Sequence, residues 1–236
     1  MPYNEYEQEV AKPLPNWEPR ELPSNVVITG RFCTVVPLDL EKHSQDLFDA
    51  FELVGDGRTW TYLRLGPFSN VQEFKKGWKD LPKDSTDIFF AIIDNNTTKP
   101  TGIFNLRRCD PYNGTIEEGY VAFSPLLQRT KMATEANYLL ASYVFDDLKY
   151  RRYEWQCVNF NKPSANAAMR LGFKYEGTLR QNMVFKGRTR DTIWLSIIDN
   201  EWDSCKRALE LWLEDTNFDS EGHQIQRLQD IRDSLV

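Results

Sequence analysis

The spacing of apolar residues along the chain alternates between the period of a helix and that of a strand. Apolar residues at intervals of three and four predict amphipathic helices. These helices fall at residues 41–54, 69–78, 131–149, 161–172 and 202–213. Short runs of β-branched and aromatic residues, bounded by turn residues, predict strands. These strands fall at residues 31–39, 87–94, 101–109, 115–123, 151–158, 173–180 and 191–199.

This order of elements predicts an α+β fold. Asn, Pro and Gly separate the strands between residues 87 and 123, which predicts an antiparallel meander of three strands. Residues 1–25 are rich in proline and charge, so we expect an extended N-terminal arm there. We expect the main domain at 26–199 and a helical C-terminal extension at 200–236.

Composition narrows the classes of function. The net charge of −6 in 236 residues argues against a broad basic surface for nucleic acid. No run approaches the roughly 20 apolar residues that span a bilayer, and the first residues lack the pattern of a signal peptide. The four cysteines form no close pair that would suggest a metal site. We expect a cytoplasmic protein that binds no metal, membrane or nucleic acid.

The start of the predicted helix after residue 130 carries an unusual charge pattern. Arg129 and Lys131 lie where the unpaired N–H groups and the helix dipole are already positive. A bound anion such as a phosphate would stabilise that arrangement. The alternative is a basic turn exposed to solvent.

The segment from Asn159 to Phe173 carries the signals of a short capped helix. Asn161 is in position to cap its first turn, Pro163 lies inside that turn, and Gly172 ends the helix. Capping alone explains these residues.

Together the two segments resemble the GNAT superfamily of acetyl-CoA-dependent N-acetyltransferases, and most closely its RimJ/RimL-like branch of ribosomal-protein N-terminal acetyltransferases. The family motif is Gln or Arg, two residues, Gly, one residue, then Gly or Ala, and it aligns with Gln128 to Ala133. Lys131 replaces the usual glycine; its side chain either points outward or adds a cationic contact. The resemblance implies a mixed, mostly antiparallel sheet of six or seven strands, flanked by helices, with a central V-shaped splay.

The resemblance also implies an activity. An acetyl group would pass from acetyl-CoA to a primary amine, either a protein N-terminus or a small molecule, by direct attack without a covalent enzyme intermediate. The residues implied to bind the cofactor are Val121, Phe123, Gln128, Arg129, Thr130, Lys131, Met132, Ala133, Thr134, Asn161 and Ser164. The enzyme would act as a monomer or homodimer.

Two residues are candidates for catalysis. Glu117 and Glu118 point to opposite faces of a strand, so we expect only one on the cofactor side. Glu118 resembles the Glu before Gly in this branch and is the predicted base, although an exposed strand residue is the alternative. Ser164 is the predicted acid for the departing thiolate, or simply a cap. The loop with Trp60, Tyr62 and Arg64 lies where the family builds its acceptor site; the alternative is a surface loop anchored by buried rings.

Two other classes of function compete with this hypothesis. A non-catalytic acyl-CoA-binding or protein-interaction module with the same fold would explain Lys131. Nucleic-acid binding through the basic pairs at residues 107–108 and 151–152 has little support, because both pairs fit ordinary strand edges.

Overall fold

Eight strands form a single sheet in the computed structural model, which describes residues 2–235. The strands are β1 (Ile28–Thr29), β2 (Cys33–Pro37), β3 (Ile88–Asp94), β4 (Pro100–Asp110), β5 (Thr115–Phe123), β6 (Arg152–Val158), β7 (Lys174–Phe185) and β8 (Arg188–Ile198). Their order across the sheet is β1-β2-β3-β4-β5-β6-β8-β7. Neighbouring strands are antiparallel except for β5 and β6, which are parallel. The predicted α+β fold and the meander β3-β4-β5 are confirmed.

The splay of the sheet lies between β5 and β6. Their pairing runs from Thr115 with Arg152 to Glu118 with Trp155 and then stops. Both strands continue, β5 to Phe123 and β6 to Val158, so their last residues diverge. This is the V-shaped opening that the family resemblance implied.

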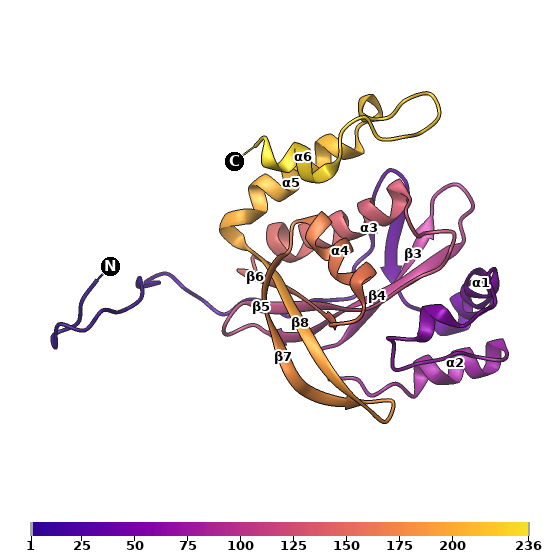
Figure 1. Ribbon diagram of the computed structural model, residues 1–236, viewed down its shortest axis with the longest axis horizontal. Coiled ribbons are helices and arrows are strands. Elements are labelled where there is room, and N and C mark those ends of the chain that lie inside the picture. The colour runs from indigo at the N-terminus through magenta and orange to yellow at the C-terminus, as the bar shows by residue number, and fades with distance from the viewer. Residues whose placement is uncertain (1, 236) are drawn as a thin grey trace.

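The helices cover both faces of the sheet (Figure 1). They are α1 (Leu40–Glu52), α2 (Val71–Lys79), α3 (Lys131–Ser142), α4 (Lys162–Leu171), α5 (Asp199–Leu213) and α6 (Leu228–Asp233), with short 3-10 or π turns η1 (Arg58–Trp60), η2 (Tyr143–Asp147) and η3 (Asp215–Asn217). One core packs α3, α4, α5 and α6 against the sheet, with Phe104 and Tyr153 fully buried in it. A second core packs α1, η1 and α2 on the other face around Phe74 and Trp78.

Side-chain caps explain where the helices begin. Asp39, Asn70, Thr130 and Asn161 cap α1, α2, α3 and α4 by accepting backbone N–H groups of the first turn. The predicted caps at Asn161 and Gly172 are confirmed, whereas Ser69 was the wrong start for α2, because the oxygen one residue later reaches the N–H of the first turn.

Three predicted boundaries differ from the structure. The sheet has eight strands rather than six or seven, because β1 adds two residues that pair with β2. The helix predicted to run to residue 149 leaves α-helical geometry after Ser142 and continues as the π turn η2. The last hairpin is longer than predicted, and its tip approaches α2 in Figure 1.

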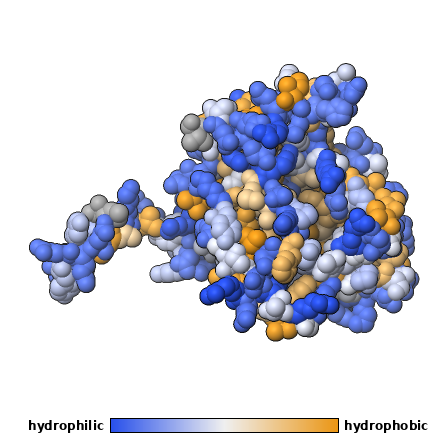
Figure 2. Space-filling view, viewed as in Figure 1, coloured by the Kyte–Doolittle hydropathy of each residue, from blue (hydrophilic) through white to orange (hydrophobic). Residues whose placement is uncertain are grey.

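The two terminal segments behave differently. From residue 2 the arm runs away from the body (Figure 1). The surface shown in Figure 2 is mainly hydrophilic, with small separate apolar areas. The arm contacts the body at Trp17, whose indole N–H donates to the Tyr112 carbonyl at 2.8 Å. The C-terminal segment packs α5 and α6 next to α3 and α4. The division at residues 25 and 199 remains a prediction.

Candidate active site

A cavity of about 1390 Å³ occupies the opening between β5 and β6. Its walls come from α3 and α4 on one face of the sheet and from η1 and the loop after it on the other. The cavity therefore connects the two faces at the place where the strands no longer pair. A long ligand that crosses the sheet would fit this shape, and apolar and polar groups both line it.

One end of the cavity is the N-terminus of α3. Thr130 caps the helix by accepting the Ala133 N–H at 3.1 Å, and its own hydroxyl donates to the Leu127 carbonyl at 2.7 Å. The Gln128 amide donates to the Phe123 carbonyl at 2.7 Å, which ties this loop to the end of β5. Arg129 has a positive φ of 62°, a left-handed conformation that non-glycine residues seldom adopt. The loop therefore presents backbone N–H groups and positive charge to one point.

Lys131 lies beside the C-terminal segment. Its ammonium nitrogen is 3.4 Å from the centre of the Phe218 ring, a cation–π contact. Phe218 packs in turn against Trp212, with ring centres 5.1 Å apart. Arg170 of α4 covers Trp212 from the cavity side, and it donates to the Thr134 hydroxyl at 3.1 Å. The side chain that replaces the motif glycine is thus held by a segment outside the motif.

The start of α4 forms another wall. The Asn161 side chain accepts the Ser164 N–H at 3.3 Å, so its role as a cap is established. The Ser164 hydroxyl accepts the Trp155 indole N–H at 3.0 Å. An oxygen that accepts this bond still has its own proton to donate. Ser164 lines the cavity, so that proton can reach a ligand there.

Glu118 lies on the face of β5 that carries α3. Its side chain is 2 % exposed, and one carboxyl oxygen accepts the Tyr153 hydroxyl at 2.6 Å. The other oxygen has no hydrogen-bond partner among the described residues. Burial raises the pKa of Glu118 to about 8, and the bond from Tyr153 opposes that rise. The group is mostly protonated at neutral pH.

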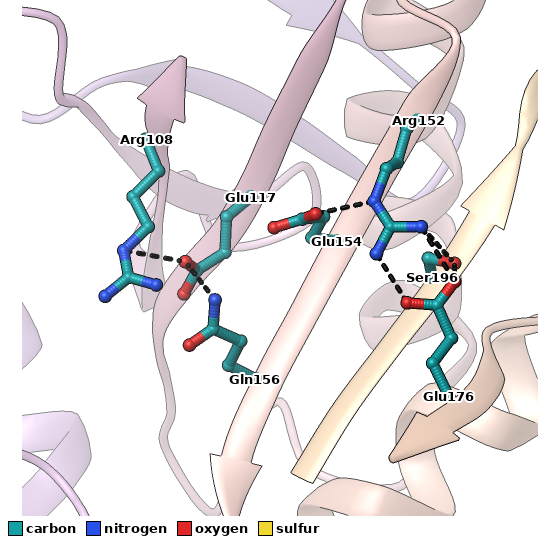
Figure 3. Close-up of polar contacts among 7 residues, drawn as sticks. All are labelled: Arg108, Glu117, Arg152, Glu154, Gln156, Glu176 and Ser196. Atoms are coloured by element: carbon teal, nitrogen blue, oxygen red, sulfur yellow. Dashed lines mark hydrogen bonds and ion pairs between the residues drawn. The ribbon is translucent and has the colours of Figure 1, made fainter. Parts of the chain in front are cut away.

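Glu117 lies on the opposite face, toward η1 and its loop, and is 4 % exposed. Its carboxylate contacts the Arg108 guanidinium at 3.4 Å and accepts the Gln156 amide at 3.1 Å (Figure 3). Burial raises the pKa of Glu117 to about 7, while the charges of Arg107 and Arg108 hold it down. A carboxyl with a pKa near neutrality can both take and release a proton.

A separate group of polar contacts next to this site joins side chains of β6, β7 and β8. Arg152 contacts Glu154, Glu176 and Ser196 (Figure 3). These residues do not line the cavity. Arg152 makes no direct contact with Glu117, whose side-chain polar contacts among the described residues are with Arg108 and Gln156.

The structure brings together nearly all the residues predicted for the site. Both catalytic candidates line the cavity, and so do ten of the eleven cofactor candidates, Ser164 being in both groups. Met132 is the exception, because its side chain packs against the main core beneath α3. Sequence reasoning missed the wall from the C-terminal segment. That wall consists of Trp212, Phe218, Gly222, His223 and Gln224.

Among residues 2–235, no group of three or more His, Cys, Asp or Glu side chains is arranged to hold a metal ion. In the same part of the chain, no helix has both the length and the apolar character needed to cross a bilayer. Location in the cytoplasm and the oligomeric state stay predictions.

The fold and the cavity define an acyltransferase class, and comparison with known proteins identifies the family. The acetyltransferase (GNAT) domain family matches residues 38–174, more than half of the chain, so the chain belongs to the GNAT family and is an N-acetyltransferase. A GCN5-related N-acetyltransferase from Brucella melitensis has a crystal structure with a TM-score of 0.89 and 44% identity, covering 93% of this chain and all of that one.

Two relatives from Bacillus are more distant. An uncharacterized N-acetyltransferase, p20 of Bacillus licheniformis, is 29% identical over 154 residues, which cover 62% of this chain and 84% of that protein. YdaF of Bacillus subtilis (strain 168), provisionally named a ribosomal N-acetyltransferase, is 27% identical over 174 residues, which cover 72% and 91%.

Proposed function

We propose that the protein transfers an acetyl group from acetyl-CoA to a primary amine, and that the amine attacks the thioester directly. The observation that supports this most is the cavity that crosses the sheet. It joins an anion-binding helix start on one face to a buried carboxylate of near-neutral pKa on the other. GNAT enzymes use acetyl-CoA, whose phosphates and acetyl group lie at opposite ends of a long molecule.

The proton transfers can be assigned to residues of this chain. The amine nitrogen bonds to the carbonyl carbon, and Glu117 takes the proton that the nitrogen loses. The carbon–sulfur bond then breaks, and the Ser164 hydroxyl passes its proton to the thiolate and regains one from solvent, while Glu117 releases the proton it took to solvent. The products are an acetamide and CoA. The proposal replaces Glu118 by Glu117 as the base. Both residues line the cavity, but the Glu118 carboxyl is hydrogen-bonded to the buried Tyr153, whereas Glu117 lies on the face of η1 and the loop after it.

The cofactor residues divide into two groups. We place the pyrophosphate at the backbone of residues 129–133, with Lys131 as a cationic contact. Beyond Glu118, β5 has no strand partner on the β6 side, so the backbone from Val121 to Phe123 is available to pair with the pantetheine arm. A backbone N–H there would polarise the acetyl carbonyl. The wall formed by Trp212 and Phe218 makes the C-terminal extension part of the nucleotide site.

Assignment to the RimJ/RimL-like branch remains part of the proposal. The likeness to YdaF supports it at 27% identity. Lys131 was the reason for the non-catalytic alternative. Its contact with Phe218 weakens that argument, because the ring holds the Lys131 side chain beside the proposed pyrophosphate site.

Calorimetric titration with acetyl-CoA tests the cofactor site, with desulfo-CoA and adenosine as controls. We expect micromolar binding of acetyl-CoA and of desulfo-CoA, since the phosphates dominate, and much weaker binding of adenosine. Arg129→Ala is expected to weaken binding, whereas the exposed control Arg180→Ala, which does not line the cavity, is not. Absence of acetyl-CoA binding by the folded protein would overturn the proposed function.

A further inference from the structure

The acceptor end of the cavity is basic, although the chain as a whole carries a net charge of −6. Arg64 from the loop after η1, Arg107 from β4 and Arg190 from β8 all line the cavity on the face of Glu117. Three separate elements therefore direct guanidinium groups to one chamber. Sequence alone gave no sign of this cluster, because the three residues are far apart along the chain.

These three arginines have no carboxylate within ion-pair distance among the described residues. Arg64 has only the Met183 sulfur at 3.9 Å, and the Arg190 Nε donates to the Thr192 hydroxyl at 3.3 Å. The buried Nε of Arg107 has no partner.

The acidic residues around the chamber do not neutralise this charge. Asp56 is paired with Arg58, and Glu117 with Arg108, which lies outside the cavity lining. Glu52 lies at the exposed rim of α1. The Asp87 carboxylate partly offsets the positive charge of Arg107, because the two groups interact electrostatically. Arg107, Arg108 and Arg190 all act on the single carboxylate of Glu117, and Arg64 has no ion pair among the described residues, so the chamber keeps an excess of positive charge.

Arg64 and Arg190 also repel each other. Burial lowers the pKa of Arg190 and the positive charge of Arg64 lowers it further, whereas the Glu117 carboxylate acts in the opposite direction. Both guanidinium groups line the same cavity. Arginine is suited to a carboxylate, because its planar fork can donate two parallel hydrogen bonds. A carboxylate from outside would remove the repulsion.

The outer side of the chamber is bridged by contacts between distant elements. The Lys186 ammonium at the hairpin tip donates to the Trp60 carbonyl at 2.8 Å, and the Tyr62 hydroxyl donates to the Phe160 carbonyl at 3.4 Å. These contacts link the hairpin tip and the loop before α4 to η1 and its loop, and walls joined in this way suit a small acceptor better than a folded protein surface.

We propose that the acceptor is a small amine that carries a carboxylate, of the amino-acid class, with Arg64 and Arg190 binding the carboxylate while the amine faces Glu117. This rests on the proposed function, since it assigns the acceptor of the same reaction. The arginines act as specificity-determining residues. A polyamine is disfavoured, because its charges would meet two guanidinium groups that have no ion pair among the described residues.

The test measures release of CoA with a thiol reagent, using the full chain, acetyl-CoA and a panel of amines. The panel holds free amino acids, the amide of each amino acid, spermidine and a peptide with a free N-terminus. We expect at least one free amino acid to be acetylated, with a kcat/KM at least about tenfold above that of its amide. Spermidine and the peptide are expected to be poorer acceptors.

Variants then locate the carboxylate site. Arg64→Gln and Arg190→Gln should each raise KM for that amino acid about ten- to a hundredfold and leave the KM of its amide nearly unchanged. Arg190→Lys should be intermediate, because it keeps the charge and loses the fork. Arg188→Gln removes the same charge from an exposed position on the same strand, outside the cavity lining, and should change neither KM.

Several results would overturn the proposal. Preference for spermidine, for the peptide or for amides would do so, as would an unchanged KM in folded Arg64→Gln and Arg190→Gln. If no amine is acetylated although acetyl-CoA binds, the acceptor assignment fails and the cofactor site stands. Calorimetry with acetyl-CoA on each variant separates these cases from loss of folding or of the proposed function itself.

Discussion

Glu117 and Glu118 are neighbours in sequence and are almost equally buried, yet the two faces of β5 give them different surroundings. Glu118 faces α3, where Tyr153 is its hydrogen-bond donor and one carboxyl oxygen has no partner. Glu117 faces η1 and the loop after it, and Arg108 of β4 and Gln156 of β6 contact its carboxylate. Burial raises the pKa of both groups, but only Glu117 has cations that keep it near 7.

The difference shows that burial alone does not identify a catalytic carboxylate. A base must reach the substrate and must also exchange its proton near the working pH. We propose that Glu117 meets both conditions, because it lies on the face of η1 and its loop and its pKa is raised only to about 7, whereas the pKa of Glu118 is raised to about 8. The face of the sheet on which each carboxyl lies therefore distinguishes the two residues, because successive residues of a strand point to opposite faces.

The largest expected effect concerns turnover. Glu117→Gln should lower kcat by about 10²- to 10⁴-fold, the usual range for loss of a general base, with little change in the Kd for acetyl-CoA. Glu118→Gln should lower kcat by less than about tenfold, because its carboxyl lies on the core side of β5. Steady-state kinetics with a saturating amine and calorimetry on both variants make the measurement.

The pH profile of kcat provides the control. A base with a pKa near 7 gives a kcat that rises through about pH 7 in the wild-type enzyme, and this limb should vanish in Glu117→Gln. A limb near pH 8 that persists in Glu117→Gln and disappears in Glu118→Gln would instead assign the base to Glu118.

The sequence was sufficient for the fold and for the local geometry of the two segments predicted to bind the cofactor. Local signals determined these parts: the caps at Asn161 and Gly172, the turn residues of the meander, and the motif from Gln128 to Ala133. Alternation along β5 also put Glu117 and Glu118 on opposite faces. It did not say which face meets the acceptor, because that depends on which helices cover each side.

Long-range packing explains what the sequence did not predict. Phe218 lies 87 positions after Lys131, so no local pattern indicated that its ring would contact the Lys131 side chain, which stands where the motif usually has glycine. Met132 was included because it belongs to the motif, but its place in the helical turn directs its side chain to the core. Nothing near Arg64 in sequence indicated that Arg190 would lie close to it.

A smaller effect concerns stability, and its sign follows from the pKa of Glu118. The folded value of about 8 lies above the usual 4.5, so folding favours the protonated form. The contribution of this group to the free energy of unfolding is fully present at about pH 4 and is lost as the pH rises through about 8. At the higher pH a buried charge must form without a cation beside it. Glu118→Gln should reduce this loss by an amount on the order of 1–3 kcal/mol at pH 9.

Urea unfolding of the wild type, Glu118→Gln and Glu117→Gln at pH 6 and pH 9 measures that loss. Glu117→Gln is the matched control, because Arg107 and Arg108 already compensate the Glu117 charge, and its effect on the pH dependence should be smaller. Equal pH dependence of unfolding in the wild type and Glu118→Gln would mean that the buried carboxyl finds a cation or water when it ionises.

The smallest expected effect is on the affinity for acetyl-CoA, at the start of α3. There the position of a cation, the Lys131 ammonium, depends on the neighbouring Phe218 ring. Phe218→Ala should weaken acetyl-CoA binding about three- to tenfold, since the Lys131 ammonium loses the aromatic face that holds it at the cradle. Phe218→Leu keeps the packing against Trp212 without the ring, so it separates the two contributions. In a Lys131→Gly background, which restores the motif glycine, Phe218→Ala should have no further effect. A loss of affinity that is the same with and without Lys131 would show that Phe218 acts on the nucleotide directly or through Trp212, and would remove Lys131 from the binding site.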